Sequence, residues 1–213
     1  MVVVTCQQHL KGLRMIDSAP SAALFVANDL ALDFINSAYG HSAAPVDVLQ
    51  GDQAAIDWLA AAGVLDAGAV PTPNGVAALA AALRDEAREL LAAAWAGRPF
   101  QAPVVNKVLE AGRPIVQLQS STDGAGPCVV ERRRDGSAES LLEPIAVALS
   151  RLLTGGDLRH VRECEAHDCT LLFHDTTKSR KRRWCSMALC GNRMKVAAFR
   201  SRKLNPPGFR GGQ

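Results

Sequence analysis

The chain has 213 residues, with 24 Lys+Arg against 21 Asp+Glu and a net charge of +3. Hydrophobic residues make up 48% of the sequence and charged residues 21%, which excludes a disordered or fibrous protein and fits one domain with at most a small second module. No apolar run reaches the roughly 18 residues of a membrane-spanning helix, and the first cations follow the apolar start instead of preceding it as in a secretory signal. We therefore expect a cytoplasmic protein without a membrane partner.

Charge is unevenly distributed along the chain. Residues 1–158 hold 11 Lys+Arg and 17 Asp+Glu, whereas residues 159–213 hold 13 and 4. An acidic body thus carries a basic tail. Such a tail is typical of proteins that bind a polyanion, although charge alone fits an ordinary solvated surface equally well.

The N-terminal part predicts mainly helices. Residues 24–37 fit a short strand that runs into a helix, and residues 47–65 predict a helix closed by Gly63. The clearest pattern covers residues 76–95, where an apolar stripe recurs at helical spacing after start signals at residues 72–74. The opposite face of that helix, expected to meet solvent, carries Arg84, Asp85, Arg88 and Glu89.

The next stretch predicts a shorter helix over residues 103–112 and a β-hairpin formed by residues 115–119 and 127–132 around an Asp123-Gly124 turn. A further helix covers residues 140–153. It begins either with a capping box of Ser140 and Glu143 or with Pro144 in its first turn. The Gly155-Gly156 pair ends it and marks the expected domain boundary, after which residues 158–162 form a short helical or strand segment.

Four of the six cysteines lie in the basic tail, in two C-x4-C pairs separated by fifteen residues: Cys164 and Cys169, then Cys185 and Cys190. Two such pairs can place four thiolates at the corners of a tetrahedron, the geometry of a closed structural zinc site. Four thiolates also suit an iron–sulfur cluster, but the cysteine runs of ferredoxins differ from these spacings, and two disulfides are disfavoured in a reducing compartment. We expect one structural Zn²⁺, with His167 or His174 as an alternative fourth ligand. Cys6 and Cys128 stand apart.

The tail also needs a metal on energetic grounds. About 50 residues bury too little surface to fold comfortably alone, and structural zinc contributes on the order of 10–16 kcal/mol. Residues 192–204 predict a helix that places Cys190 near its N-terminus, where the helix dipole favours a thiolate. The expected fold is therefore α+β. A mostly helical N-terminal domain with a small β element spans residues 1–155, and a treble-clef-like, four-cysteine zinc finger spans residues 156–205. Residues 1–20 and 206–213 are expected to be flexible.

The tail's cations are the candidate DNA contacts. One group belongs to a predicted hairpin tip (Lys178, Arg180, Lys181, Arg182, Arg183), and the other to the last helix (Arg193, Lys195, Arg200, Arg202, Lys203). The hairpin cations suit sequence-independent phosphate contacts, whereas Arg193 and Arg200 suit base edges or fixed phosphates. Arg193 has an alternative role in bracing the zinc site. We expect Val196 and Phe199 to pack on the finger, and Trp184 to belong to its core or to stack on a base.

Residues 164–193, which include Arg183-Trp184-Cys185-Ser186-Met187 and Cys190-Gly191-Asn192-Arg193, closely resemble the CGNR-type zinc finger of a bacterial family of stress-induced transcription regulators. Residues 30–36 (LALDFIN), with Trp58-Leu59 and Ala62-Gly63, resemble the N-terminal ABATE domain of that family. The resemblance implies four cysteine ligands and a DNA-binding role. Family members have an aliphatic residue at the position of His174 and Arg at that of Lys178, and the family pattern begins shortly after Met15, which suggests Met15 instead of Met1 as the natural start.

These features favour a zinc-dependent, DNA-binding transcription regulator that is not an enzyme. Asp168, Asp175 and the nearby histidines lack the nucleophile, oxyanion motif or open metal position that catalysis would need. The alternative is a zinc-stabilised protein-interaction module, whose basic surface meets an acidic partner or the acidic N-terminal domain. The N-terminal domain would sense a small-molecule effector or another signal, and a homodimer is compatible with the sequence. We also expect this domain to fold without zinc.

Overall fold

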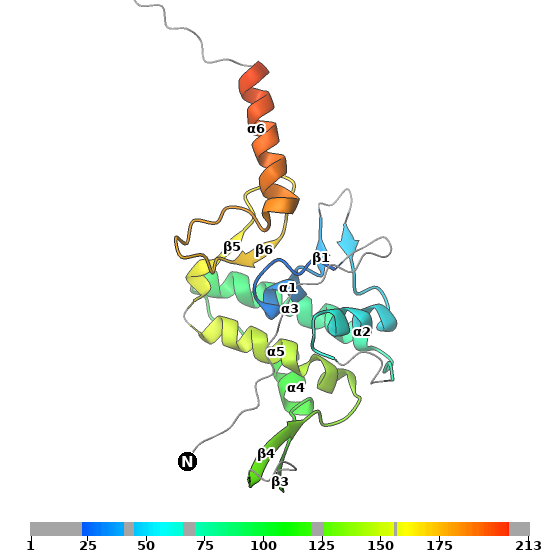
Figure 1. Cartoon of the computed structure of the whole chain (residues 1–213). Coiled ribbons are helices and arrows are strands. Elements are labelled where there is room, and N and C mark those ends of the chain that lie inside the picture. The colour runs from blue at the N-terminus through cyan, green and yellow to red at the C-terminus, as the bar shows by residue number, and fades with distance from the viewer. Residues whose placement is uncertain (1–22, 41–44, 66–70, 121–125, 156, 205–213) are drawn as a thin grey trace, which may run out of the picture.

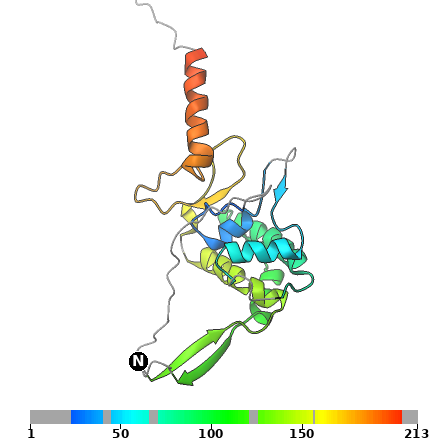
Figure 2. The same ribbon diagram turned by 45° about the vertical axis from the view of Figure 1, so that its right-hand side comes forward.

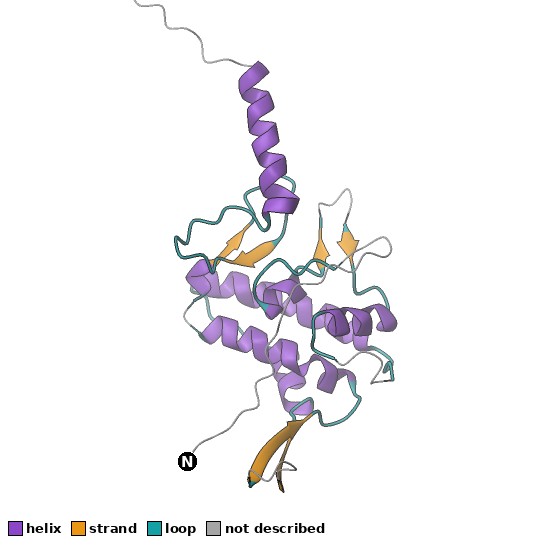
Figure 3. Cartoon of the chain, in the orientation of Figure 1, coloured by secondary structure: helices purple, strands orange, loops and turns teal. Residues whose placement is uncertain are grey.

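The computed structural model describes residues 23–40, 45–65, 71–120, 126–155 and 157–204, and the side chains of these residues up to 200. The expected flexibility of residues 1–20 and 206–213, the Met15 start and the Asp123-Gly124 turn lie outside this part of the chain. Within it, six α-helices and three two-stranded antiparallel sheets form an α+β structure (Figure 3). No helix in the described segments is long and apolar enough to cross a membrane.

Five helices make up the N-terminal body (Figure 1): α1 (Leu30–Ile35), α2 (Asp52–Ala61), α3 (Val76–Trp95), α4 (Pro103–Ala111) and α5 (Ala138–Thr154). The long helix α3 contacts the other four, and the short helix α1 lies against both α3 and α5. Leu83 and Leu90 of α3 are buried with Phe34 of α1 and Leu141 of α5 in one apolar core. The predicted stripe of α3 is therefore the centre of the body.

The predicted bounds of α3 are confirmed, but its start signal is not the predicted one. Gly75 precedes the helix with a left-handed backbone (φ +83°), a conformation that glycine adopts without a steric cost. The carboxylate of Asp52, at the start of α2, accepts hydrogen bonds from the N–H groups of Gly75 (2.8 Å) and Ala77 (2.9 Å). A residue far away in the sequence thus caps this helix, which local patterns do not reveal.

The prediction that Arg84 faces solvent is wrong. Its side chain is buried, with only 4% of the residue exposed, and it donates two hydrogen bonds to the carboxylate of Asp47 (2.8 and 2.6 Å) and a third to Ser37 Oγ (2.9 Å). These bonds lower the pKa of Asp47. The small hairpin of β1 (Ala38–Tyr39) and β2 (Val46–Asp47) brings Asp47 to this face of α3, which helical periodicity assigns to water. Asp85 and Glu89 are exposed as predicted.

Other boundaries shift by a few residues. The helix expected over residues 47–65 begins only at Asp52, because Asp47 belongs to β2; Gly63 follows its end with φ +72°. Helix α5 begins before both predicted starts, since Ser137 caps it by accepting a hydrogen bond from the N–H of Ser140 (3.2 Å), and Pro144 lies inside the helix. The strand expected before α1 is absent: residues 23–29 form no sheet strand, and residues 27–29 are bends in which Asn28 has φ +59°.

The predicted β-hairpin is present as β3 (Ile115–Ser120) and β4 (Pro127–Arg132), and it extends away from the body (Figure 2). Leu118, 76% exposed, pairs with Val129 on the opposite strand. The hairpin is thus the most peripheral part of the N-terminal body.

The C-terminal module consists of a 3₁₀ turn η1 (Leu158–His160), strands β5 (Val161–Glu163) and β6 (Leu172–His174), a π-helical turn η2 (Met187–Gly191) and helix α6 (Asn192–Leu204). Strands β5 and β6 pair around the first two cysteines. Helix α6 points away from the rest of the molecule (Figures 1 and 2). Val196 and Phe199 are 48% and 58% exposed, so the expectation that they pack on the finger is wrong.

The module is seated on α1. Phe173 of β6 is fully buried in the same core as Phe34 of α1. The side-chain amide of Asn36 pairs with the backbone of Leu172 in β6, and the N–H of His174 donates to the carbonyl of Ala27 (2.7 Å). Body and module therefore share a continuous apolar core and a hydrogen-bonded edge.

Candidate metal centre

Four cysteine side chains converge at the base of α6. Cys164 follows β5, Cys169 precedes β6, Cys185 precedes η2, and Cys190 lies within η2. Their Sγ atoms all lie within 4.8 Å of one another, with 3.8 Å between Cys169 and Cys185 and 3.6 Å between Cys185 and Cys190. Tetrahedral zinc with Zn–S bonds of about 2.3 Å requires neighbouring sulfurs about 3.8 Å apart. The four thiols thus fit one Zn²⁺ ion.

Backbone hydrogen bonds hold the ligand-bearing loops in place. The N–H of Cys185 donates to Cys164 Sγ (3.3 Å), and the N–H of Cys164 donates to the carbonyl of Leu171 (2.9 Å). Ser186 begins the η2 turn, where its Oγ accepts from the N–H groups of Ala188 and Leu189 (3.1 and 3.4 Å). The site is therefore organised by local structure as well as by its ligands.

Ionisation of the thiols also favours a cation at their centre. The hydrogen bond with Cys185 lowers the pKa of Cys169 to about 5, whereas that bond, together with burial, raises the pKa of Cys185 far above its ordinary value. Burial raises the pKa of Cys190 to about 11. Of these three thiols, Cys169 alone ionises readily without a counter-charge, because neighbouring anions this close repel one another. A bound divalent cation removes this conflict and deprotonates its thiol ligands.

Arg193 braces the site, which is the second of its two predicted roles. Its guanidinium donates to both carboxylate oxygens of Asp168 (2.6 and 2.7 Å), and Nη2 also lies 3.5 Å from Cys190 Sγ. The positive charge next to this sulfur stabilises the thiolate form. Asp168 therefore orients Arg193, a role that spacing alone did not reveal.

Gly191 lies in close packing with Met187 and Trp184 at the start of α6. A Cβ at this position would lie 2.5 Å from Met187 Sδ and 3.0 Å from Trp184 Cδ1. Trp184 is half-buried there, consistent with a place in the finger core. Three of the four residues from 190 to 193 thus serve the centre in different ways: Cys190 as a ligand, Gly191 by leaving space, and Arg193 by charge.

The basic segment between β6 and η2 forms a loop wound around Asp175, not the predicted hairpin tip. The buried Asp175 carboxylate accepts from Thr177 N–H (3.0 Å), Thr177 Oγ1 (2.6 Å) and the N–H of Arg182 (2.9 Å). Burial raises the pKa of Asp175, but these hydrogen bonds outweigh that effect and lower it. Asp175 thus pairs with the backbone of Arg182, while the guanidinium of Arg180 donates to the backbone carbonyl of Asp175.

Arg182 holds the finger to the body and is removed from the candidate DNA contacts. Its Nε donates to the carbonyl of Trp184 (2.8 Å), and its Nη2 donates to the carbonyls of Cys185 and, in the N-terminal body, Val26 (3.0 Å). The guanidinium also stacks over Phe173, 4.4 Å from the ring centre. A side chain with these contacts has little capacity left for a phosphate.

The remaining candidates differ in accessibility. Lys178, Lys181, Lys195 and Arg200 are exposed. Arg183 is also accessible, with 62% of its side chain exposed, although it pairs with Glu165 (2.6 Å) and lies over the ring of Trp184. Arg180 is half-buried. The side chains of Arg202 and Lys203 lie outside the described residues.

Neither histidine joins the four sulfurs. His167 is exposed, and His174 lies on β6; the metal-binding cluster found within the described segments contains only cysteines. Cys128 lies on β4, away from the cluster, and Cys6 is outside the described residues. All four positions of a tetrahedral ion are filled by protein sulfur.

Fold and site together define a helical body that carries a treble-clef-like finger with one structural zinc ion. Residues 160–203 match the family model of the CGNR zinc finger. Residues 28–156, more than half of the chain, match the ABATE model, described as "Putative stress-induced transcription regulator", and the chain belongs to this family. No curated protein matches the chain.

Proposed function

We propose that this protein is a cytoplasmic transcription regulator that binds DNA through its zinc module and is not an enzyme. One observation carries the proposal: from residue 176 to residue 213 the chain has 11 Lys+Arg and no Asp or Glu. The exposed members of this set lie on α6 and on the loop wound around Asp175, both attached to the zinc centre. A charge distribution of this kind is the electrostatic signature of a nucleic-acid surface.

The shape of the module supports the same function. Helix α6 projects from the molecule, and a lone helix fits the major groove of B-DNA, which is about 12 Å wide. Lys195 and Arg200 are five positions apart, so at about 100° per residue they lie on opposite margins of the helix. Both margins can approach the phosphate backbones that flank a groove. Lys178 and Lys181 on the adjoining loop suit further phosphate contacts.

The absence of an enzymatic role is supported by the metal chemistry. Catalytic zinc sites keep one position for water or substrate, whereas four cysteines saturate a structural site. The four sulfurs here fill the tetrahedron, and three of the cysteines are buried. The zinc ion therefore serves the architecture of the DNA-binding surface.

The test is a salt titration of binding to random-sequence duplex DNA by the zinc-loaded chain. A double variant, Lys178→Ala with Lys181→Ala, should weaken binding to all sequences alike and lower the slope of log K against log salt by about 0.9 per lost phosphate contact. The matched control, Arg98→Ala with Arg113→Ala, removes the same charge from exposed positions of the body and should leave the slope nearly unchanged. Arg200→Ala should cost about 1–3 kcal/mol on a preferred site if Arg200 reads a base.

A protein-interaction module is the second candidate, favoured by exposed apolar side chains next to the cations. Met187, Leu189 and Val196 are 48%, 42% and 48% exposed around η2 and the first turns of α6. Such residues suit a protein partner with an acidic rim. Unchanged DNA affinity and salt slope in both lysine and Arg200 variants, with zinc content intact, would replace the DNA function with this one.

A further inference from the structure

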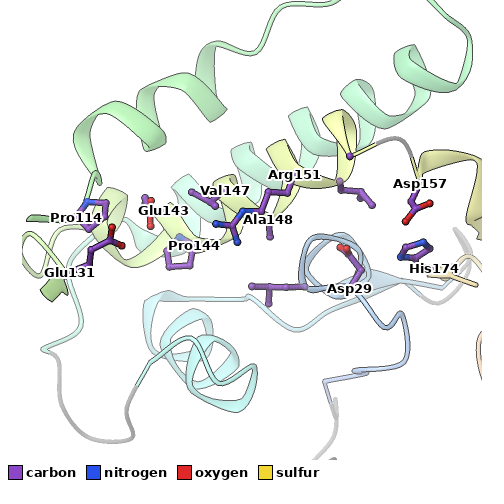
Figure 4. Close-up of a pocket in the computed structure, with 13 residues that line it drawn as sticks. Asp29, Pro114, Glu131, Glu143, Pro144, Val147, Ala148, Arg151, Asp157 and His174 are labelled. Atoms are coloured by element: carbon purple, nitrogen blue, oxygen red, sulfur yellow. The ribbon is translucent and has the colours of Figure 1, made fainter. Parts of the chain in front are cut away.

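A cleft of about 590 Å³ lies where the body meets the zinc module (Figure 4). Helix α5 forms one wall with Pro144, Val147 and Arg151. Asp29, at the start of α1, and His174, on β6, line one end of the cleft together with Asp157. The volume is within the range of about 300–1,000 Å³ that small-molecule sites occupy.

The interior of the cleft is apolar. Leu30, Pro144, Val147, Ala148 and Leu152 contribute hydrocarbon surface from two helices. Such a lining suits the carbon skeleton of an organic molecule better than an inorganic ion.

The charges around this apolar lining are mostly negative. Four carboxylates line the cleft, from Asp29, Glu131, Glu143 and Asp157, against the single guanidinium of Arg151. Within the described residues, none of these five groups forms an ion pair. Burial, followed by repulsion from Glu131, raises the pKa of Glu143, and the nearby Arg151 and Arg133 offset this effect only in part.

An unsatisfied polar atom lies at the finger end of the cleft. Nε2 of His174 is buried and has no hydrogen-bond partner among the described residues, although the ring lines the cleft. Buried polar atoms in native proteins nearly always have a partner. A ligand in the cleft would be placed to supply one.

We propose that this cleft binds a small organic cation, with its apolar body along α5 and its amino groups among the carboxylates. An anion would meet an excess of carboxylates, and a neutral apolar molecule would displace water from these carboxylates without offering them a positive charge, so both are disfavoured. The ligand would contact α5 of the body and β6 of the finger at once. Ligand binding in the cleft is therefore expected to change the environment of β6 in the zinc module. The binding itself does not depend on whether the module binds DNA.

The probe is 1,5-diaminopentane, titrated calorimetrically into the zinc-loaded full chain without DNA. We expect saturable binding of one diamine per chain, and binding at least about tenfold weaker for pentane-1,5-diol and for pentanedioate, which keep the length but lose or reverse the charge. The amide and ring signals of His174 should shift on addition of the diamine. A diamine that binds no better than the diol would overturn the proposal.

Two variants locate the binding. Asp157→Asn should weaken the diamine about tenfold, since it removes the carboxylate next to His174 but keeps the shape of the side chain. Glu89→Gln, an exposed position of α3 outside the cleft, is the matched control and should leave the affinity unchanged. Equal diamine affinities for the two folded variants would mean that the diamine binds elsewhere, and this would contradict the assignment of its site to the cleft.

Discussion

The side-chain amide of Asn36 forms two hydrogen bonds with the backbone of Leu172, 136 positions away: Nδ2 donates to the carbonyl (2.8 Å) and Oδ1 accepts from the N–H (2.9 Å). Asn36 is buried, and it occupies the edge of β6 where another strand would otherwise pair. The last residue of the LALDFIN stretch thus joins the body to the zinc module.

Replacing Asn36 with Ala should lower the free energy of unfolding by about 2–4 kcal/mol. The change leaves the N–H and the carbonyl of Leu172 buried and unpaired, and each such group costs about 1–3 kcal/mol. Urea denaturation of the zinc-loaded chain measures the effect. Asn106→Ala, at an exposed position of α4, is the control and should change stability by less than about 0.5 kcal/mol. Similar losses in the two variants would refute the role of Asn36.

Zinc content should depend on Cys164 and not on Cys128. Cys164→Ser removes one of four converging sulfurs, whereas Cys128 lies on the peripheral hairpin strand β4. We expect about one zinc per chain in Cys128→Ser, as in the unchanged protein, and a clear loss in Cys164→Ser. Metal analysis of the purified chains is the measurement, and equal content in both variants would contradict the ligand assignment.

Chelation of zinc should loosen more than the tail. From the sequence we expected only the finger to depend on metal, but Phe173 shares a buried core with α1. Hydrogen exchange after zinc removal should therefore show faster exchange in residues 160–200 and in α1, while α3 keeps its protection because it packs on the remaining helices. If α1 kept its protection, or if α3 lost it, the segment that unfolds on zinc removal would not be the one that shares a buried core with Phe173.

Stability should fall with rising pH because of Asp33. Burial raises the pKa of this carboxyl from 3.8 to about 7, against the lowering effect of hydrogen bonds from the N–H groups of Ala27 and Val26. The folded state then holds a proton that the unfolded state has released, so the contribution of Asp33 to stability declines from about pH 4 to about pH 7 and is level above it.

The variant Asp33→Asn tests this sign, because an amide keeps the acceptor for Ala27 but does not titrate. Between about pH 5.5 and 7.5, the stability of the original chain relative to the variant should decline by on the order of 1–2 kcal/mol. The pH dependence of zinc binding is common to both chains and cancels in this difference. A difference that stays constant, or that grows in favour of the aspartate, would contradict the shift.

The variants Arg193→Ala and Arg200→Ala should distinguish an arginine that supports the zinc site from one that only lies on the surface of α6. Arg193 contacts Asp168 and Cys190 Sγ, so its loss should weaken zinc retention in a competition with a chelator. Arg200 is exposed on α6, and its loss should leave zinc retention unchanged. Equal retention in the two variants would mean that Arg193 does not support the site.

Local sequence patterns were sufficient to predict the elements that are determined by residues close together in the sequence. The bounds of α3 and α6, the strand segments of the β3–β4 hairpin and the convergence of four cysteines follow from periodicity, breakers and spacing. Contacts between distant segments were not accessible in this way. Arg84 was assigned to solvent because its partner Asp47 comes from another element, and the helix-capping role of Asp52 has no local signature.

At the candidate site, too, local features could be predicted and contacts between distant residues could not. The ligands could be predicted from spacing, but the roles of neighbouring arginines could not, because Arg182 and Arg193 carry the same charge and differ only in what surrounds them. Arg182 is enclosed by backbone carbonyls and Phe173, and Arg193 by Asp168 and a sulfur. An asparagine at the end of the LALDFIN stretch was the one available signal of a buried polar contact to the finger.

Helix α6 begins two residues after its zinc ligand Cys190 and projects from the module, so it acts mechanically as a lever whose pivot is the metal centre. Thirteen residues at about 1.5 Å each give an arm of about 20 Å. A tilt of about 10° at the pivot would move the far end by about 3.5 Å, roughly the rise between neighbouring base pairs of DNA. Small changes in the seating of β6 on α1 would therefore be amplified at the tip, where they could change the register of the helix against a regularly spaced partner.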